Sequence, residues 1–200
     1  MSQNLSLSRA PKHLVLVGYR GSGKSSIGRE LAMMLGLDYV DTDHAIQEKA
    51  GKSVREIFAE QGEPVFRDME TDILQELVNR SSAAPPSVIA TGGGMIMREQ
   101  NRRLIRRLGP VVWLRVSPKV ALHRIISDTF TREQRPALTE HDLADEVRTM
   151  VADRLPYYAA VADLTVDNDQ EGQSREDVAG RILDQLRESH WYQDLKARLN

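Results

Sequence analysis

The stretch Gly18-Tyr-Arg-Gly-Ser-Gly23-Lys24-Ser25 decides the fold of this 200-residue chain. It matches in full the pattern G-x-x-x-x-G-K-[ST], in which glycines let the backbone curl so that its N–H groups point at a polyphosphate. In such a loop the lysine reaches the β- and γ-phosphates and the serine hydroxyl can bind Mg²⁺. The alternative is a glycine-rich turn that carries Lys24 and Ser25 by chance.

The flanking segments favour the phosphate-binding interpretation. The apolar, β-branched run 13–17 ends at Gly18 and predicts a buried strand of a parallel sheet. Apolar residues at helical spacing, among them Ile27 and Leu31, predict a helix from Lys24 to about residue 35, with Gly36 as its C-cap. This strand–loop–helix context indicates a nucleoside triphosphate, but it does not say what receives the phosphoryl group.

The rest of the chain alternates between short apolar runs and amphipathic segments. Further strands are expected at 38–41, 87–91, 111–116 and 162–166, and further helices at 44–50, 53–59, 64–80, 98–108, 118–127, 143–160 and 176–189. This alternation predicts an α/β fold with a parallel sheet covered on both faces. We expect one domain over 12–189, a disordered leader over 1–11, and a tail over 190–200 that could extend the last helix.

Composition excludes several classes of protein. The chain has no cysteine, which rules out disulfides and thiolate metal sites. Its net charge of −2 gives no reason to expect nucleic acid as a partner. No apolar run is long enough to cross a bilayer, and residues 1–12 lack the apolar core of a signal peptide. We expect a cytoplasmic protein without a membrane partner.

Asp41-Thr42-Asp43 follows the second expected strand, at the edge where open α/β sheets bind ligands. Two aspartates two positions apart on an extended segment project to the same side. One could hold Mg²⁺ through water while the other meets a substrate hydroxyl. The alternative for either aspartate is an N-cap of the next helix.

Four further strings contain arginines or consecutive glycines. They are Phe66-Arg67-Asp-Met-Glu70 in a helix, Gly92-Gly-Gly94 after the third strand, Arg135-Pro-Ala-Leu138 in a polar segment expected to be mobile, and Arg154-Leu-Pro-Tyr-Tyr158 in the long helix. Three glycines permit close approach of the backbone to a ligand, although a tight turn is the plainer explanation. Arg67, taken alone, favours a solvated surface residue.

Together these strings, in this order and over about residues 14–186, resemble the shikimate kinase family. The resemblance implies a three-layer α/β/α P-loop kinase fold with a five-stranded parallel sheet of order 2-3-1-4-5. It also implies substrate-binding helices at about 43–80 and a mobile lid at about 127–139. The expected reaction is transfer of the γ-phosphoryl group of ATP to the 3-hydroxyl of shikimate, a step of aromatic amino acid biosynthesis.

The resemblance also implies roles for individual residues. The catalytic residues would be Lys24, Asp43 and the lid arginine Arg135, and the metal ligands Ser25 and, through water, Asp41. ATP would be bound by Gly21, Ser22, Gly23, Lys24, Ser25, Ser26, Arg124 and Arg135. Shikimate would be bound by Asp43, Arg67, Gly92, Gly93, Gly94 and Arg154, with the two arginines on its carboxylate. The implied protein is a Mg²⁺-dependent monomer, and no adenine contact is assigned in 167–175.

Other functions stay open at this stage. A kinase of another small polyol acid such as gluconate, or of a nucleoside monophosphate, shares the phosphate-binding loop but not the pairing of two arginines with D-x-D. A nucleotide-binding regulator without catalytic activity would need no acceptor at all. A nucleic-acid-dependent ATPase would need a basic stripe or an aromatic platform, and the sequence shows neither.

Overall fold

The computed structural model describes residues 12–80, 84–127, 140–170 and 172–199. Its strands are β1 (Leu14–Val17), β2 (Asp38–Asp41), β3 (Ser87–Ala90), β4 (Val111–Arg115) and β5 (Leu164–Asp167). They form one sheet in the order β2-β3-β1-β4-β5, and all four neighbouring pairs are parallel. The expected sheet order is confirmed.

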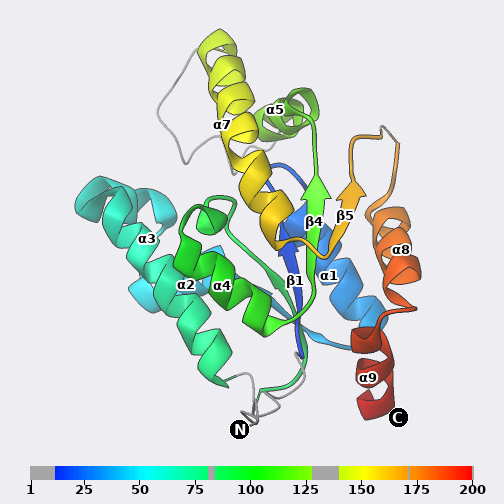
Figure 1. Ribbon diagram of the computed structural model, residues 1–200. Helices are drawn as coiled ribbons and strands as arrows, with labels where there is room; N and C mark the ends of the chain where they lie inside the picture. The colour runs from blue at the N-terminus through cyan, green and yellow to red at the C-terminus, as the bar shows by residue number, and fades with distance from the viewer. Residues whose placement is uncertain (1–11, 81–83, 128–139, 171, 200) are drawn as a thin grey trace, which may run out of the picture.

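Helices connect the strands and cover both faces of the sheet (Figure 1). They are α1 (Lys24–Leu35), α2 (Thr42–Ala50), α3 (Val54–Arg80), the short 3₁₀ helix η1 (Met95–Met97), α4 (Glu99–Leu108), α5 (Pro118–Ser127), α7 (Glu140–Val161), α8 (Arg175–Leu186) and α9 (His190–Leu199). The strands all point toward the same edge, and α5 and part of α7 lie beyond the ends of β4 and β5 there. The phosphate-binding loop follows β1 at this edge.

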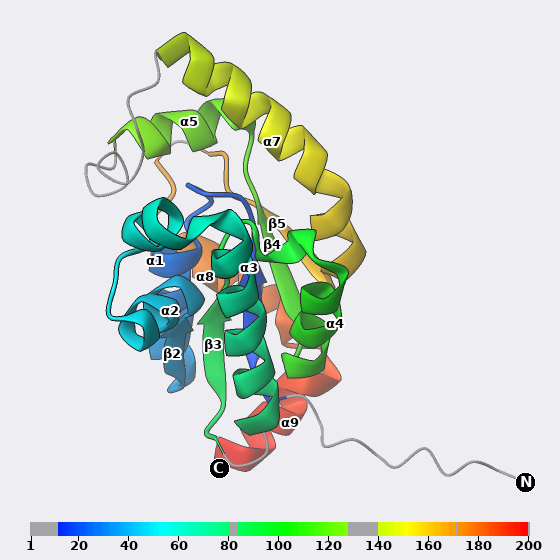
Figure 2. The ribbon, with the colours of Figure 1, turned by 90° about the vertical axis from the view of Figure 1, so that its left-hand side faces the viewer.

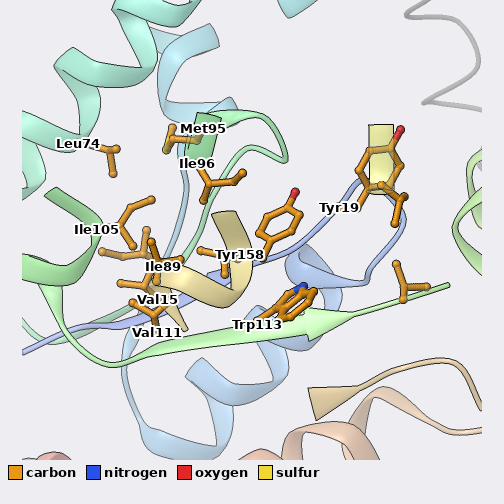
Figure 3. Close-up of a cluster of buried hydrophobic side chains, with 14 of the residues drawn as sticks. Val15, Tyr19, Leu74, Ile89, Met95, Ile96, Ile105, Val111, Trp113 and Tyr158 are labelled. Carbon is orange, nitrogen blue, oxygen red and sulfur yellow. The ribbon is translucent and has the colours of Figure 1, made fainter. Parts of the chain in front are cut away.

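Strand β1 shows why the molecule has three layers, because its alternate side chains enter two different cores. Val15 and Val17 pack with α4 and α7 on one face, where Ile105 and Trp113 also lie (Figure 3). Leu14 packs with α1, α8 and α9 on the other face. Such continuous burial of a strand is typical of a parallel sheet with helices on both sides. Figure 2 shows α3 and α4 side by side over the first of these faces.

The expected helices over 53–59 and 64–80 form one element, α3, with a break inside it. Gly62 has φ 82° and ψ 167°, a conformation that favours glycine and interrupts the helix. Pro64 follows at a position where a missing N–H costs little, because the first turn of a helix leaves its N–H groups without helical partners. The second part of α3, which carries Arg67, therefore starts in a new direction.

The prediction that the tail extends the last helix is wrong, since α8 ends at Leu186 and a separate helix begins at His190. Ser189 Oγ accepts a hydrogen bond from Tyr192 N at 3.2 Å and so caps α9. Trp191 and Leu195 are buried against the core that α1 and α8 share. Trp191 therefore helps to hold α9 against this face of the sheet.

In the parts of the chain that the structure describes, no helix is long and apolar enough to span a bilayer. The expected lid overlaps residues 128–139, which lie outside the described residues, and so does Arg135.

Candidate active site

The phosphate-binding loop joins β1 to α1 with several residues in conformations that the sequence pattern requires. Gly21 and Gly23 have φ values of 76° and 87°, which side chains larger than glycine rarely adopt. Gly23 is the N-cap of α1, so the positive end of the helix dipole points into the loop. The backbone thus has the form that binds a polyphosphate.

Lys24 lies in the centre of this loop. Its Nζ donates to the carbonyl oxygens of Gly18 at 2.8 Å and Tyr19 at 3.0 Å, and Ser22 Oγ is 3.5 Å away. Burial lowers the pKa of Lys24 to about 8, although Asp43 and Asp41 act in the opposite direction. Lys24 is therefore still mostly cationic at neutral pH and lies beside two carboxylates.

Asp41 accepts hydrogen bonds on both of its carboxylate oxygens. Its Oδ2 accepts hydrogen bonds from Ser25 Oγ at 2.9 Å and from Tyr39 OH at 3.0 Å. Its Oδ1 accepts from Asp43 N at 3.1 Å and caps α2. The capping alternative and the metal-ligand prediction are thus compatible, because they use different oxygens. The hydroxyl and carboxylate oxygens of Ser25 and Asp41 are the hard donors that Mg²⁺ prefers, so they fit that ion.

Asp43 does not lie on the extended segment that was expected to carry both aspartates. The Asp41 cap instead starts α2 at Thr42 and places Asp43 in the first helical turn. Asp43 Oδ1 is buried and has no hydrogen-bond partner among the described residues. Burial and the nearby Asp41 raise the pKa of Asp43 to about 6, although Lys24 and Arg67 act in the opposite direction. An oxygen in this position is ready to accept a proton or a hydrogen bond.

Arg67 is held on α3 by two glutamates of the same helix. Its Nη2 donates to Glu63 Oε1 and its Nη1 to Glu70 Oε2, each at 2.8 Å. The Arg67 side chain is only 17% exposed, which disagrees with the solvated-surface interpretation. Glu70 is fully buried, and its Oε1 has no partner among the described residues. Burial raises the pKa of Glu70 to about 7, although Arg67 lowers it.

Arg154 reaches the same place from α7. Its Nη1 donates to the Gly93 carbonyl oxygen at 3.2 Å. The hydroxyl of Tyr158, one helical turn later, donates to the same oxygen at 2.6 Å. The Tyr158 ring stacks on Trp113 of β4 with centroids 5.7 Å apart, and its hydroxyl points away from Trp113 (Figure 3). The sheet therefore supports the α7 turn that carries Arg154.

The three consecutive glycines bring these side chains together. A Cβ on Gly92 would stand 2.5 Å from Asp43 Oδ1, and one on Gly94 would stand 2.5 Å from Arg67 Nη1. Gly93 binds Arg154, and a Cβ there would be 3.2 Å from the backbone nitrogen of Arg20 in the phosphate-binding loop. Asp43, Arg67 and Arg154, from three different helices, thus surround one short loop that lies against Gly18–Ser25.

Arg124 connects α5 to the phosphate-binding loop from the other side. It donates to the carbonyl oxygens of Gly21 at 3.2 Å and Asn168 at 2.9 Å. Asn168 is buried and donates to the Ser22 carbonyl at 3.0 Å. These residues border a cavity of about 170 Å³, which is lined by Gly23, Ser26, Ile27, Arg124, Asn168, Gln173, Ser174, Arg175 and Val178. Ser26, predicted to bind ATP, faces this cavity rather than the acceptor side.

Three residues of the site were not assigned from the sequence. Asn168 follows β5 at the ligand-binding edge of the sheet, and this position was the only available signal. Glu70 lies three residues after Arg67, a spacing at which helical side chains meet. Tyr158 belongs to the quoted arginine string, but only the folded chain shows that it binds Gly93.

Comparison with known proteins gives consistent matches. A family profile described as Shikimate kinase matches residues 20–187. A shikimate kinase of Rhodopirellula baltica is 46% identical over 157 residues, which are 78% of this chain and 82% of that protein. One of Symbiobacterium thermophilum is 40% identical over 176 residues, 88% of this chain and 97% of that protein. A solved structure of shikimate kinase from Acinetobacter baumannii in complex with shikimate superposes with a TM-score of 0.77 at 34% identity, and covers 88% of this chain and 93% of that one.

Proposed function

This chain belongs to the shikimate kinase family, and from that premise we propose that it transfers the γ-phosphoryl group of ATP to the 3-hydroxyl of shikimate. The products are shikimate 3-phosphate and ADP. One observation carries the proposal for this chain's own residues: Asp43, Arg67 and Arg154 surround Gly92–Gly94 beside the phosphate-binding loop. A carboxylated polyol needs this combination, since an arginine binds a carboxylate through two N–H groups and an aspartate accepts a hydrogen bond from a hydroxyl.

We assign the acceptor side of the reaction to four residues. Arg67 and Arg154 bind the carboxylate of shikimate, and the Gly93 backbone contacts its ring. Asp43 accepts the hydrogen bond of the attacking hydroxyl and then takes its proton. The bond from the γ-phosphorus to the ADP oxygen breaks as the bond to the acceptor oxygen forms. Because the pKa of Asp43 is about 6, most of its carboxylate is ionised at neutral pH and can accept that proton.

The nucleotide side consists of the loop and of Arg124. Gly21–Ser26 hold the phosphates, Lys24 supplies positive charge at the β- and γ-phosphates, and the cavity beside Arg124 and Asn168 takes the adenine end. Ser25 would bind Mg²⁺ directly and Asp41 through water, and the ion would neutralise the charge of the phosphates. Such reactions depend mainly on positioning and on cations, so Arg135 is also assigned to the transferred group.

The test is a coupled assay of ADP release over a panel of acceptors. Shikimate should stimulate ADP release strongly, and gluconate and nucleoside monophosphates should not. Faster turnover with gluconate than with shikimate would contradict shikimate as the acceptor. ADP release that no acceptor stimulates would favour a nucleotide-binding regulator. For the cellular setting we propose a cytoplasmic monomer that binds neither nucleic acid nor membrane, which light scattering and cell fractionation would test.

A further inference from the structure

Tyr19, the second residue of the phosphate-binding loop, contacts both sides of the site. Its carbonyl oxygen accepts the 3.0 Å hydrogen bond from Lys24 Nζ. Its ring lies under the guanidinium of Arg154, whose Cζ is 5.4 Å from the ring centroid. Its hydroxyl donates to Met150 Sδ at 3.8 Å, one turn before Arg154 on α7. The residue is 5% exposed, so the ring is almost completely covered by its neighbours.

We propose that Tyr19 is a positioning residue that couples nucleotide binding to acceptor binding. The inference rests on the proposed function, in which Lys24 meets the phosphates and Arg154 the acceptor carboxylate. Tyr19 contacts both of these cations, Lys24 through its backbone and Arg154 through its side chain.

The nucleotide acts on Tyr19 through Lys24. An ammonium group has three N–H donors, and here two carbonyl oxygens and the Ser22 hydroxyl lie within reach of them. A phosphate oxygen that binds Lys24 must replace at least one of these partners. Nucleotide binding therefore changes the contacts of the Gly18–Tyr19 backbone, which also lies against Gly93.

The acceptor acts on Tyr19 through Arg154. A planar guanidinium is attracted to the face of an aromatic ring, and the ring limits the orientations that the arginine can take. An acceptor carboxylate that binds Arg154 in this orientation favours the same position of the Tyr19 ring. Both ligands thus act on the position of Tyr19, so their affinities are coupled and, by linkage, by the same factor in both directions. We expect the coupling to be positive, because phosphoryl transfer requires both ligands in the site at once.

A purely structural role for Tyr19 is the alternative, because the ring also belongs to the core that contains Trp113 and Tyr158 (Figure 3). The two explanations predict different results. Loss of a core ring lowers stability but leaves the effect of one ligand on the other unchanged. Loss of a coupling residue removes that effect, whatever happens to stability.

The experiment is calorimetric titration of shikimate into the full chain, with and without saturating Mg-ADP, for the wild type, Tyr19→Phe and Tyr19→Leu. Phenylalanine keeps the ring and loses the hydroxyl that contacts Met150, whereas leucine removes the ring. We expect Mg-ADP to tighten shikimate binding about fivefold or more in the wild type and in Tyr19→Phe. In Tyr19→Leu the dissociation constants of shikimate without and with Mg-ADP should be about equal. The dissociation constants of Mg-ADP without and with shikimate should then be about equal as well.

Three results would overturn the coupling role of Tyr19. They are no effect of Mg-ADP on shikimate affinity in the wild type, an undiminished effect in Tyr19→Leu, and an equal loss of the effect in Tyr19→Phe and Tyr19→Leu. Tyr19→Met, which also lacks a ring, replaces the leucine variant should thermal melting show that Tyr19→Leu is unfolded. The ADP-release assay separates the two proposals. A wild type that converts shikimate while Tyr19→Leu keeps full coupling refutes only this inference, whereas a wild type that binds shikimate without converting it refutes the proposed function.

Discussion

Gly92 and Asp43 are so close that a Cβ added to Gly92 would stand 2.5 Å from Asp43 Oδ1 and 3.1 Å from Glu70 Oε1. The Gly92 N–H donates to Thr42 Oγ1 at 2.9 Å, which holds the backbone of Gly92 against α2. The buried oxygens of Asp43 and Glu70 can therefore lie beside Gly92 only because Gly92 has no side chain.

Gly92→Ala should reduce turnover strongly, because the new methyl group displaces Asp43 from the acceptor hydroxyl. A displacement of about 1 Å at a reacting group can cost on the order of 10²-fold in rate. Steady-state kinetics of ADP release would measure the loss. The matched control is Gly180→Ala in α8, where nothing lies within 4 Å of the new Cβ. That variant should keep wild-type turnover and gain about 0.5–1 kcal/mol of stability, and equal losses in both would contradict the steric explanation.

Thr71→Val should weaken shikimate binding through the support of the glycine loop. Thr71 Oγ1 lies 2.8 Å from Asn101 Oδ1, and Asn101 Nδ2 donates to the Met95 carbonyl just after Gly94. Valine leaves the buried Asn101 oxygen without this partner, at a cost of about 1–3 kcal/mol. We expect a higher KM for shikimate, an unchanged KM for ATP and a lower melting temperature. Thr71→Ser keeps the hydroxyl and should restore both the KM for shikimate and the melting temperature, and failure of this rescue would refute the role of the hydrogen bond.

Glu70→Gln should change how stability depends on pH. Burial raises the pKa of Glu70 from 4.5 to about 7, so folding favours its protonated form. The stability that this provides is complete below about pH 4.5 and is lost as the pH rises through 7. Glutamine lacks this titration while it still accepts a hydrogen bond from Arg67. The free energy of unfolding of the variant, measured in urea, should therefore improve relative to the wild type between pH 4.5 and 7.

The control for that experiment is Glu63→Gln. Glu63 also binds Arg67, but its side chain is 60% exposed. Its stability profile should run parallel to that of the wild type over the same pH range. A parallel profile for Glu70→Gln as well would mean that burial of Glu70 does not control its protonation.

Lys24→Ala should abolish turnover and leave the fold intact. The substitution removes the cation that contacts Gly18 and Tyr19, while the φ values of Gly21 and Gly23 that shape the loop stay accessible. Circular dichroism would check the fold and the ADP-release assay the turnover. Substantial residual activity would mean that Lys24 is not the main cation at the transferred group.

The arrangement of strands and helices was largely predictable, because the central strands β1, β3 and β4 are continuous buried runs and glycine ends many of the segments. Gly36 and Gly62 end helical segments with positive φ values, as their positions suggested. The separate helix α9 was missed, although Ser189 is a common capping residue. Helical spacing alone does not distinguish a continued helix from two helices joined by a short turn.

The site could be predicted as a set of residues, but not as a set of contacts. The motifs indicated Asp43, Arg67 and Arg154, whereas their pairing with Gly92, Gly94 and Gly93 depends on how α2, α3 and α7 pack on the sheet. Short sequence motifs do not show how distant helices pack against each other. Asn168 lies in a loop without periodicity, so only the folded chain shows that it binds Ser22.

The most direct test of the account is calorimetric titration of shikimate into Asp43→Asn, Arg67→Ala and Arg154→Ala, with Arg148→Ala on the exposed side of α7 as control. If the three residues form one acceptor site, each substitution should weaken shikimate binding by at least ~30-fold, since loss of a buried charged partner costs about 2–5 kcal/mol. ADP binding should stay unchanged, and the control should bind both ligands normally. Wild-type shikimate affinity in any of the three variants, or an equal loss of ADP affinity, would contradict the account.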